Sequence, residues 1–434
     1  MSNSATYKKP PHKKRKTSPS PPDSSWSPLS SLPDEMILSC LARVSRLDQA
    51  ALSIVSKSYR SLMASPELYK TRSKVGYAEN CLYVCLLTPP DLTPRWFILR
   101  RGETLNRLSP IPSLCSQPPE ASSVVVMDWG IYVIGGFIKE TTRTSDVWLL
   151  DCRTHTWRQV PSMGVARACA AVGVVNGKIY VFGGCLDPDS SNWAEVFDPK
   201  TQTWDSLPPM PDRIKRDQYI HDSVVVRGEK IYAVDGIDRT YCYSPCEGKW
   251  GRGNDAPTNG NRRDWCVIDG LIFCISRSGS VYWCEPDQLE CEPEGMYWRK
   301  VKGLVSLKKR LSSSRLVHFD GKIEALWESY KITIGRDKKL IDLLPGTRLS
   351  NSGSNILLLW DVIEEDHLQI WCAEISLERR QGPEIWGNIV WSNALMSVDP
   401  FLHHYKCASM VVKSNAYNNI LGFGECMRCS ALQR

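Results

Sequence analysis

Residues 179–184 read IYVFGG and residues 131–136 read IYVIGG, so one apolar strand with a glycine pair occurs twice in the chain. A tryptophan follows each strand at a similar distance. The pattern extends beyond these two copies, because tryptophans recur at intervals of 47, 46 and 48 residues, at Trp157, Trp204, Trp250 and Trp298. A repeat of nearly constant length, about 50 residues, predicts a fold built from successive copies of one small sheet.

The clearest copy of the repeat lies at residues 170–208 and divides into four short strands. Asn176-Gly177 separates the first two strands, and this dipeptide is a strong signal for a tight β-hairpin. Four-stranded repeats with a glycine pair and a later tryptophan are typical of kelch repeats in a β-propeller. The glycine pairs are then structural, since glycine permits close backbone approaches that a Cβ forbids. Similar copies lie at 123–160, 222–250 and 264–301.

A weaker copy of the repeat lies further along the chain. It begins at residues 316–319, has its first hairpin at 321–323 and ends at 389–391. This copy contains an excess of about 40 residues near 330–366. Because long segments without regular structure are uncommon in compact domains, we expect the excess to form a long loop or an extra hairpin.

The first copy of the repeat, at residues 82–110, has only three strands. Residues 406–412 resemble the segment at 167–172, so we predict that they supply the missing strand and close the ring. Closure removes the exposed strand edges that an open array would carry. The prediction is therefore a propeller of six blades, or of seven if residues 416–423 begin another.

The net charge of the chain is +7 at pH 7, but it is unevenly distributed. Residues 1–27 hold six Lys and Arg against Asp23 alone, so they account for five of these charges. The other residues of the chain are nearly neutral in sum, and such a charge balance does not predict direct nucleic-acid binding. The basic cluster at residues 8–16 is either a nuclear import signal or a disordered, solvated tail. The sequence contains no run of 18 apolar residues, so it predicts no membrane-spanning helix.

Residues 29–75 have a different character and predict three or four short helices. So short a unit buries little apolar surface and often leaves some for a partner to cover. The opening Leu32-Pro33-Asp34-Glu35 and the later segment Val55-Ser56-Lys57-Ser58-Tyr59-Arg60 together resemble an F-box. One departure is Tyr59, where that family often has Trp; the substitution keeps a large aromatic ring.

The two modules together resemble the plant-type F-box/kelch-repeat family. Residues 192–204 and 370–380 look like the most recognisable segments of its propeller. The fold class expected is therefore multidomain, a small all-α F-box followed by an all-β kelch propeller. The resemblance implies a substrate-recognition subunit of a Skp-cullin-F-box ubiquitin ligase, located in the nucleus, the cytoplasm or both. A kelch scaffold or ligand sensor without a ligase role remains the alternative.

The resemblance also implies which F-box residues bind the Skp-type adaptor. Some of these apolar residues must also build the core of so small a unit. They are Leu32, Pro33, Ile37, Leu41, Val44, Leu47 and Val55. The domain boundaries expected are a basic tail at 1–27, the F-box at 28–75, the propeller at 80–415 and a C-terminal tail at 416–434.

No catalytic constellation is evident, so we expect a non-enzymatic adaptor without a cofactor or a metal. None of the seven histidines lies in a known catalytic motif. Zinc needs four ligands. Cys426 and Cys429 could supply two of them, and only the weak set of His403, His404 and Cys407 could complete the site. Many of the 17 cysteines, Cys169 among them, fall in predicted strands and indicate buried free thiols in a reducing compartment.

The links between successive repeats are rich in basic residues. In a propeller these links emerge at one end, where they would surround the central channel. We expect this end to bind an acidic segment of a protein substrate, since charge aids both capture and selectivity. The alternative is a solvated surface, with a structural role for Arg167. The residues are Arg167, Arg213, Lys215, Arg216, Arg262, Arg263, Lys308 and Lys309.

Overall fold

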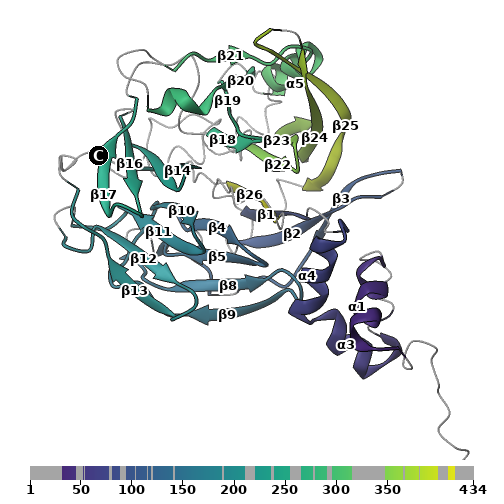
Figure 1. Ribbon diagram of the computed structural model, residues 1–434. Coiled ribbons are helices and arrows are strands. Elements are labelled where there is room, and N and C mark those ends of the chain that lie inside the picture. The colour runs from purple at the N-terminus through teal and green to yellow at the C-terminus, as the bar shows by residue number, and fades with distance from the viewer. Residues whose placement is uncertain are drawn as a thin grey trace, which may run out of the picture. The chain divides into compact units, whose positions relative to one another are not determined.

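The computed structural model divides the chain into two compact units, residues 1–77 and residues 78–434 (Figure 1). Each unit is described by itself. The described residues are 32–44, 52, 54–77, 81–87, 94–102, 104–114, 116–118, 121–139, 142–187, 190–210, 220–235, 239–254, 265–276, 279–290, 296–314, 348–364, 367–380, 382–398 and 409–415.

The first unit is helical and has a small core. Its helices are α1 (Asp34–Ala42), α3 (Lys57–Met63) and α4 (Pro66–Lys74). Ser56 caps α3, because its hydroxyl oxygen accepts a hydrogen bond from the Tyr59 backbone N–H at 3.1 Å. No described helix of the chain is long and apolar enough to span a bilayer. The buried apolar side chains among the described residues of this unit are Ile37, Leu41, Ala42, Met63 and Leu68.

The second unit contains six four-stranded antiparallel sheets, which are the blades of a propeller. This confirms the predicted six-bladed fold. Blade 1 contains β26 (Ser409–Asn415), β1 (Cys81–Leu87), β2 (Arg95–Arg100) and β3 (Arg107–Pro110). Blade 2 contains β4 (Ser123–Met127), β5 (Gly130–Ile134), β8 (Val147–Asp151) and β9 (Thr156–Val160). Blade 3 contains β10 (Ala171–Val175), β11 (Lys178–Phe182), β12 (Ala194–Asp198) and β13 (Thr203–Ser206).

The other three blades follow the same strand order. Blade 4 contains β14 (Ile220–Arg227), β15 (Lys230–Asp235), β16 (Thr240–Ser244) and β17 (Lys249–Arg252). Blade 5 contains β18 (Trp265–Ile268), β19 (Leu271–Ile275), β20 (Val281–Cys284) and β21 (Arg299–Lys300). Blade 6 contains β22 (Arg348–Ser352), β23 (Asn355–Glu364), β24 (His367–Arg380) and β25 (Glu384–Val398). Shorter elements are β6 (Phe137–Lys139), β7 (Thr142–Arg143), the 3-10 helix η3 (Pro286–Leu289) and α5 (Val305–Ser314).

The first strand of each blade is the innermost one. These strands contact one another in the ring order β26, β4, β10, β14, β18 and β22, and β22 contacts β26 again. In blade 1 the innermost strand comes from the C-terminal part of the chain, and β26 pairs with β1 from Cys81↔Asn415 to Leu87↔Ser409 (Figure 1). Two distant segments of the chain therefore share one sheet, which closes the ring.

Blade 6 differs from the sequence prediction. Its inner hairpin is β22 and β23, at residues 348–364, which lie within the segment that we expected to be excess. The expected first strand and hairpin, at residues 316–323, lie outside the described residues, as do residues 416–423. The run from Ile356 to Trp360 is buried throughout. A strand that is buried on both faces lacks the alternation of polar and apolar residues that marks most strands, which explains the error.

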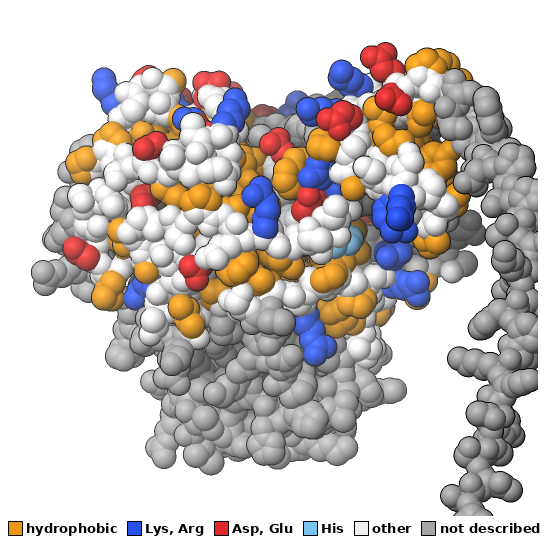
Figure 2. All heavy atoms as spheres, turned by 90° about the horizontal axis from the view of Figure 1, so that it is seen from below, with side chains coloured by type: hydrophobic (Ala, Val, Ile, Leu, Met, Phe, Trp, Pro, Cys, Tyr) orange, Lys and Arg blue, Asp and Glu red, His pale blue; other side chains and the backbone are white. Residues whose placement is uncertain are grey.

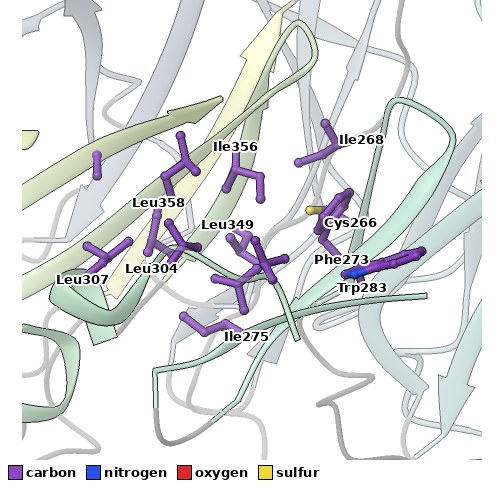
Figure 3. Close-up of a cluster of buried hydrophobic side chains, with 14 of the residues drawn as sticks. Cys266, Ile268, Phe273, Ile275, Trp283, Leu304, Leu307, Leu349, Ile356 and Leu358 are labelled. Carbon is purple, nitrogen blue, oxygen red and sulfur yellow. The ribbon is translucent and has the colours of Figure 1, made fainter. Parts of the chain in front are cut away.

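The blades pack against each other through apolar clusters that cross their boundaries. Figure 3 shows the cluster between blades 5 and 6, in which Phe273 and Trp283 of blade 5 lie near Ile356 and Leu358 of blade 6. Leu304, Leu307 and Leu311, from the link that contains α5, complete this cluster. The link is therefore part of the propeller core as well as a connection.

The recurring tryptophans also join neighbouring blades. In the first three of these tryptophans, the indole Nε1–H donates to a proline carbonyl in the link that follows the preceding blade. The N···O distances are 2.8 Å for Trp157 to Pro112, 2.8 Å for Trp204 to Pro161 and 2.7 Å for Trp250 to Pro208. Trp298 is buried, and its Nε1 has no partner within the described residues; the corresponding link, at residues 255–264, lies outside them. These bonds explain why tryptophan recurs at this position.

Candidate functional site

The helical unit exposes large apolar side chains beside its small core. Met36 in α1 is 53% exposed, and Ile54 and Val55 are 79% and 70% exposed. Large apolar side chains left in water in this way can form a surface that a partner covers. This is one candidate site of the chain.

The structure places the seven predicted adaptor-binding residues in different environments. Ile37 and Leu41 are buried in the core, which is the second role expected for some of these residues. Leu32 and Val44 are half-buried, and the Val44 carbonyl accepts a hydrogen bond from Arg72 Nη1 at 2.6 Å. The remaining surface residues are Pro33 and Val55, which are exposed, whereas Leu47 lies outside the described residues.

Two exposed residues of this surface, Met36 and Ile54, were missed in the sequence. Each is the neighbour of a predicted residue, Ile37 or Val55. Successive residues of a helix point about 100° apart, so Ile37 faces the core while Met36 faces water, whereas Ile54 and Val55 are both exposed. Periodicity identifies an apolar pair such as Met36 and Ile37, but with so few turns it does not say which member is buried.

The propeller presents two kinds of connection at one of its ends. Because neighbouring strands run antiparallel, the loop from the second to the third strand of a blade emerges beside the link to the next blade. The bridge between Thr144, in such a loop of blade 2, and Arg167, in the following link, shows this arrangement. We call this end of the propeller the link end. Loops at such an end are held by a rigid scaffold and are suited to recognition.

Arg167 does not line this end as a surface residue. It is fully buried, and its guanidinium pairs with Glu195 at 2.8 Å between Nη2 and Oε2. Nη1 donates to the carbonyls of Gly183 at 2.6 Å and Trp193 at 2.7 Å, and Nη2 also donates to the Asn192 carbonyl. A guanidinium with this many internal acceptors is not available to a substrate. The structure therefore corrects the predicted binding role of Arg167 to a structural one.

The glycine pair of blade 3 belongs to the same region. Gly184 has a φ of +72°, and a Cβ there would lie 2.5 Å from the Ala168 carbonyl oxygen. Only glycine allows the loop to pass so close to the link. This agrees with the structural role predicted for the glycine pairs.

The other predicted basic residues are described only in part. Lys308 and Lys309 lie in α5, where Lys308 is half-buried. On the face drawn in Figure 2, basic and acidic side chains are interspersed. The remaining five lie outside the described residues: Arg213, Lys215, Arg216, Arg262 and Arg263.

Two loops at the link end carry exposed apolar residues on neighbouring blades. Ile138, in the β6–β7 hairpin of blade 2, is 52% exposed, and Leu186, after β11 of blade 3, is 80% exposed. Between them, Arg143 Nε donates to the Gly184 carbonyl at 3.0 Å. The Arg143 guanidinium carbon lies 5.4 Å from the centre of the Phe137 ring. We call Phe137, Ile138, Arg143 and Leu186 the Arg143 patch.

The described cysteines and acids give no sign of a metal or nucleophile site. No group of three or more His, Cys, Asp and Glu within the described residues could hold a metal ion. Burial raises the pKa of the Cys85 thiol to about 12, which keeps it protonated and unreactive. Cys169 is bonded in a disulfide, which corrects its prediction as a free thiol. The residues of the weak zinc set lie outside the described residues.

Comparison with known families agrees with both units. Residues 29–71 match the F-box domain family, and residues 96–344 match the family described as FKB95, Kelch-repeats domain. An F-box/kelch-repeat protein of Arabidopsis thaliana is 42% identical over 95% of this chain and 99% of its own length. A second one from the same plant is 37% identical over 89% of this chain and 96% of its own length.

A search of solved structures finds the protein YjhT, at a TM-score of 0.43 and 12% identity, covering 68% of this chain and 91% of that one. The fold assignment rests on the strand order above and not on this likeness. The chain is thus an F-box protein whose second unit is a kelch propeller. It belongs to the plant F-box/kelch-repeat family. Members of this family are generally non-catalytic adaptors, in which the F-box implies a Skp-type partner and the propeller implies a bound substrate.

Proposed function

We propose that this protein is the substrate-recognition subunit of a Skp-cullin-F-box ubiquitin ligase. The observation that carries the proposal is the exposure of Met36, Ile54 and Val55 on a unit that belongs to the F-box family. Their burial against a partner would be worth about 25 cal/mol for each Å² of apolar surface removed from water. A Skp-type adaptor is the partner that an F-box implies.

The proposed mechanism is proximity. The propeller binds the target protein while the F-box connects it, through the adaptor and the cullin, to a ubiquitin-conjugating enzyme. Holding two reactants together makes their encounter effectively intramolecular and supplies a large part of the rate. The chain itself then performs no bond chemistry.

The F-box surface offers a direct test. Purified full-length protein and a Skp-type adaptor are mixed, and affinity is measured for the wild type and for the double variant Ile54→Asp/Val55→Asp. Two carboxylates in an apolar interface should weaken binding at least tenfold, because they would be buried without partners. Val305→Asp is the matched control, since Val305 is 66% exposed on the propeller.

The same experiment separates this function from the scaffold alternative. If the intact chain does not bind the adaptor, the ligase function is wrong and a propeller scaffold is favoured.

The variant Ile37→Ala should lower the thermal unfolding midpoint of the helical unit, because it leaves a cavity in its core.

We further propose that the basic links contribute to substrate capture. Arg213, Lys215, Arg216, Arg262 and Arg263, with Lys308 and Lys309 in α5, would attract an acidic segment. Reversing the charge of Lys215 and Arg262 should slow association with a substrate and reduce its dependence on salt. An association rate that is unchanged at low salt would contradict this role.

For the basic cluster at residues 8–16 we propose a nuclear import role. Its test is the location of a fluorescent fusion in cells. Replacing the Lys and Arg of this cluster by Gln should shift the fusion from the nucleus to the cytoplasm, and an unshifted fusion would refute the role.

A further inference from the structure

The Arg143 patch lies on two loops that are fixed to each other. One is the β6–β7 hairpin between β5 and β8, and the other is the loop after β11. Arg143 joins them directly, since its Nε donates to the Gly184 carbonyl at 3.0 Å. Residues of blades 2 and 3 that are far apart in sequence therefore form one continuous surface at the link end.

Buried Arg167 holds the base of both loops in place. Its carbonyl accepts the Gly136 backbone N–H at 2.8 Å at the start of the blade 2 loop. Its guanidinium binds the Gly183 and Trp193 carbonyls at the two ends of the blade 3 loop. A surface that is already ordered loses little conformational entropy when it binds a partner. The Arg143 patch is therefore preorganised for binding.

The guanidinium of Arg143 is only partly satisfied. It is half-buried, its Nε is bonded to a carbonyl, and its plane lies near the Phe137 ring. Within the part of the chain that the structure describes, its terminal nitrogens have no acceptor and no carboxylate pairs with it. Charged groups that leave bulk water are normally paired. An arginine fork in this position is suited to a carboxylate, which it binds through two parallel hydrogen bonds.

Exposed apolar residues lie on both of the loops that Arg143 joins. Ile138 directly follows Phe137, and Leu186 lies two residues after Gly184. Single exposed apolar residues are common on protein surfaces and mean little. Here two of them lie on two loops that one arginine, without a carboxylate partner among the described residues, holds together. This combination fits a ligand that carries a negative charge next to an apolar side chain.

We propose that the Arg143 patch binds a substrate segment in which an Asp or Glu is adjacent to a large apolar residue. The carboxylate would bind the Arg143 fork, and the apolar side chain would cover Ile138 and Leu186. The proposal rests on the proposed function, because it names the segment by which the propeller would hold its target.

Fluorescence polarisation with labelled peptides tests the proposal. The probe peptide contains Asp-Leu-Phe between Gly-Ser flanks, and two matched peptides replace Asp by Asn or Leu-Phe by Ala-Ala. We expect the full-length protein to bind the probe and each matched peptide to bind at least tenfold more weakly. If the Asn peptide binds as well as the probe, or if the probe does not bind, the proposal is wrong.

Variants of the protein locate the site. Arg143→Gln and Leu186→Ser should each weaken probe binding at least tenfold, and Arg143→Lys should weaken it less, since it keeps the charge without the fork. Arg107→Gln is the matched control, because Arg107 is an exposed arginine of β3. Wild-type affinity in Arg143→Gln would overturn the proposal. The thermal unfolding midpoint of each variant shows whether it is folded.

Binding to the Skp-type adaptor is measured on the same samples. If the probe binds while the adaptor does not, the ligase function fails and the peptide site stands. If the adaptor binds while the probe does not, the peptide site fails and the ligase function stands.

Discussion

Two blade boundaries in the propeller each contain a buried carboxylate paired with an arginine, but their arginines differ in exposure. Between blades 2 and 3, Arg167 and Glu195 are 0% and 2% exposed. Between blades 6 and 1, Glu374 is 5% exposed, whereas its partner Arg101 is 48% exposed. The first boundary thus holds a dehydrated ion pair, while the second holds a buried acid whose cation remains largely in water.

The difference reflects how each boundary is closed. Blades 2 and 3 are joined by a link, and Arg167 lies within that link. After blade 6 the chain enters blade 1 as β26, which pairs with β1 inside blade 1, so backbone hydrogen bonds within that sheet close the ring. Glu374 there accepts hydrogen bonds from Trp391 Nε1 at 2.7 Å and Asn355 Nδ2 at 2.9 Å. We therefore expect the ion pair between blades 2 and 3 to contribute more to stability than the ion pair between blades 6 and 1.

The largest effect is expected from Glu195→Ala. It leaves the Arg167 guanidinium buried without its counterion, and removing one partner of a buried pair costs about 3–5 kcal/mol. The Gly164 backbone N–H also loses its acceptor, Glu195 Oε1, at 2.8 Å. Urea denaturation, followed by the tryptophan fluorescence of the propeller, measures the loss. Glu195→Gln is the control and should cost less, and a loss below about 1 kcal/mol for Glu195→Ala would contradict the comparison.

Glu374→Ala should destabilise the closing boundary less. Arg101 returns to water when its partner is removed, so the cost comes mainly from two donors left without an acceptor, about 1–3 kcal/mol. Arg101→Ala should cost about 0–1 kcal/mol, as is usual for an exposed ion pair. The same denaturation measurement applies. Equal losses in the free energy of unfolding for Glu374→Ala and Glu195→Ala would show that the exposure of the arginine does not determine the cost.

The regular part of the propeller is predictable from sequence because local chemistry and repeat length agree. Asn176-Gly177 is a hairpin signal, and both residues have positive φ, 51° and 72°, as a tight turn requires. The tryptophan interval predicts the blades because each of the first three indoles reaches an equivalent proline carbonyl in the preceding link. Blade 6 was misplaced at its start, since the apolar run from Ile356 to Trp360 carries no alternation to identify its faces.

The site residues were less predictable, because exposure depends on partners distant in sequence. An arginine in a link between strands normally faces water, and Arg167 is buried only because Glu195, 28 residues later, lies beside it. Arg143 was not singled out, since the Gly184 carbonyl that fixes it is 41 residues away. Neither contact leaves a pattern within a local window of the sequence. In the F-box, Ile37 and Met36 are adjacent, and only packing decides which one is exposed.

The smallest effect is expected from Asp151, whose partner Arg153 is in the same turn of blade 2. Burial would raise the pKa of Asp151, but hydrogen bonds from the Arg153 side chain and backbone lower it below its ordinary value. A group whose pKa is lowered by folding stabilises the protein at pH values above its unfolded-state pKa, about 3.9. This stabilisation is lost as the pH falls through the folded-state pKa. Asp151→Asn should therefore cost about 1 kcal/mol at pH 7 and progressively less below about pH 4. Arg153 and Asp151 are 11% and 14% exposed, so they are mostly buried but less so than the pair between blades 2 and 3. Because they are two residues apart, they join no blades, and urea denaturation at pH 7 and pH 3 should give a smaller loss than Glu195→Ala. A loss as large as that of Glu195→Ala would mean that burial, and not the joining of blades, determines the cost.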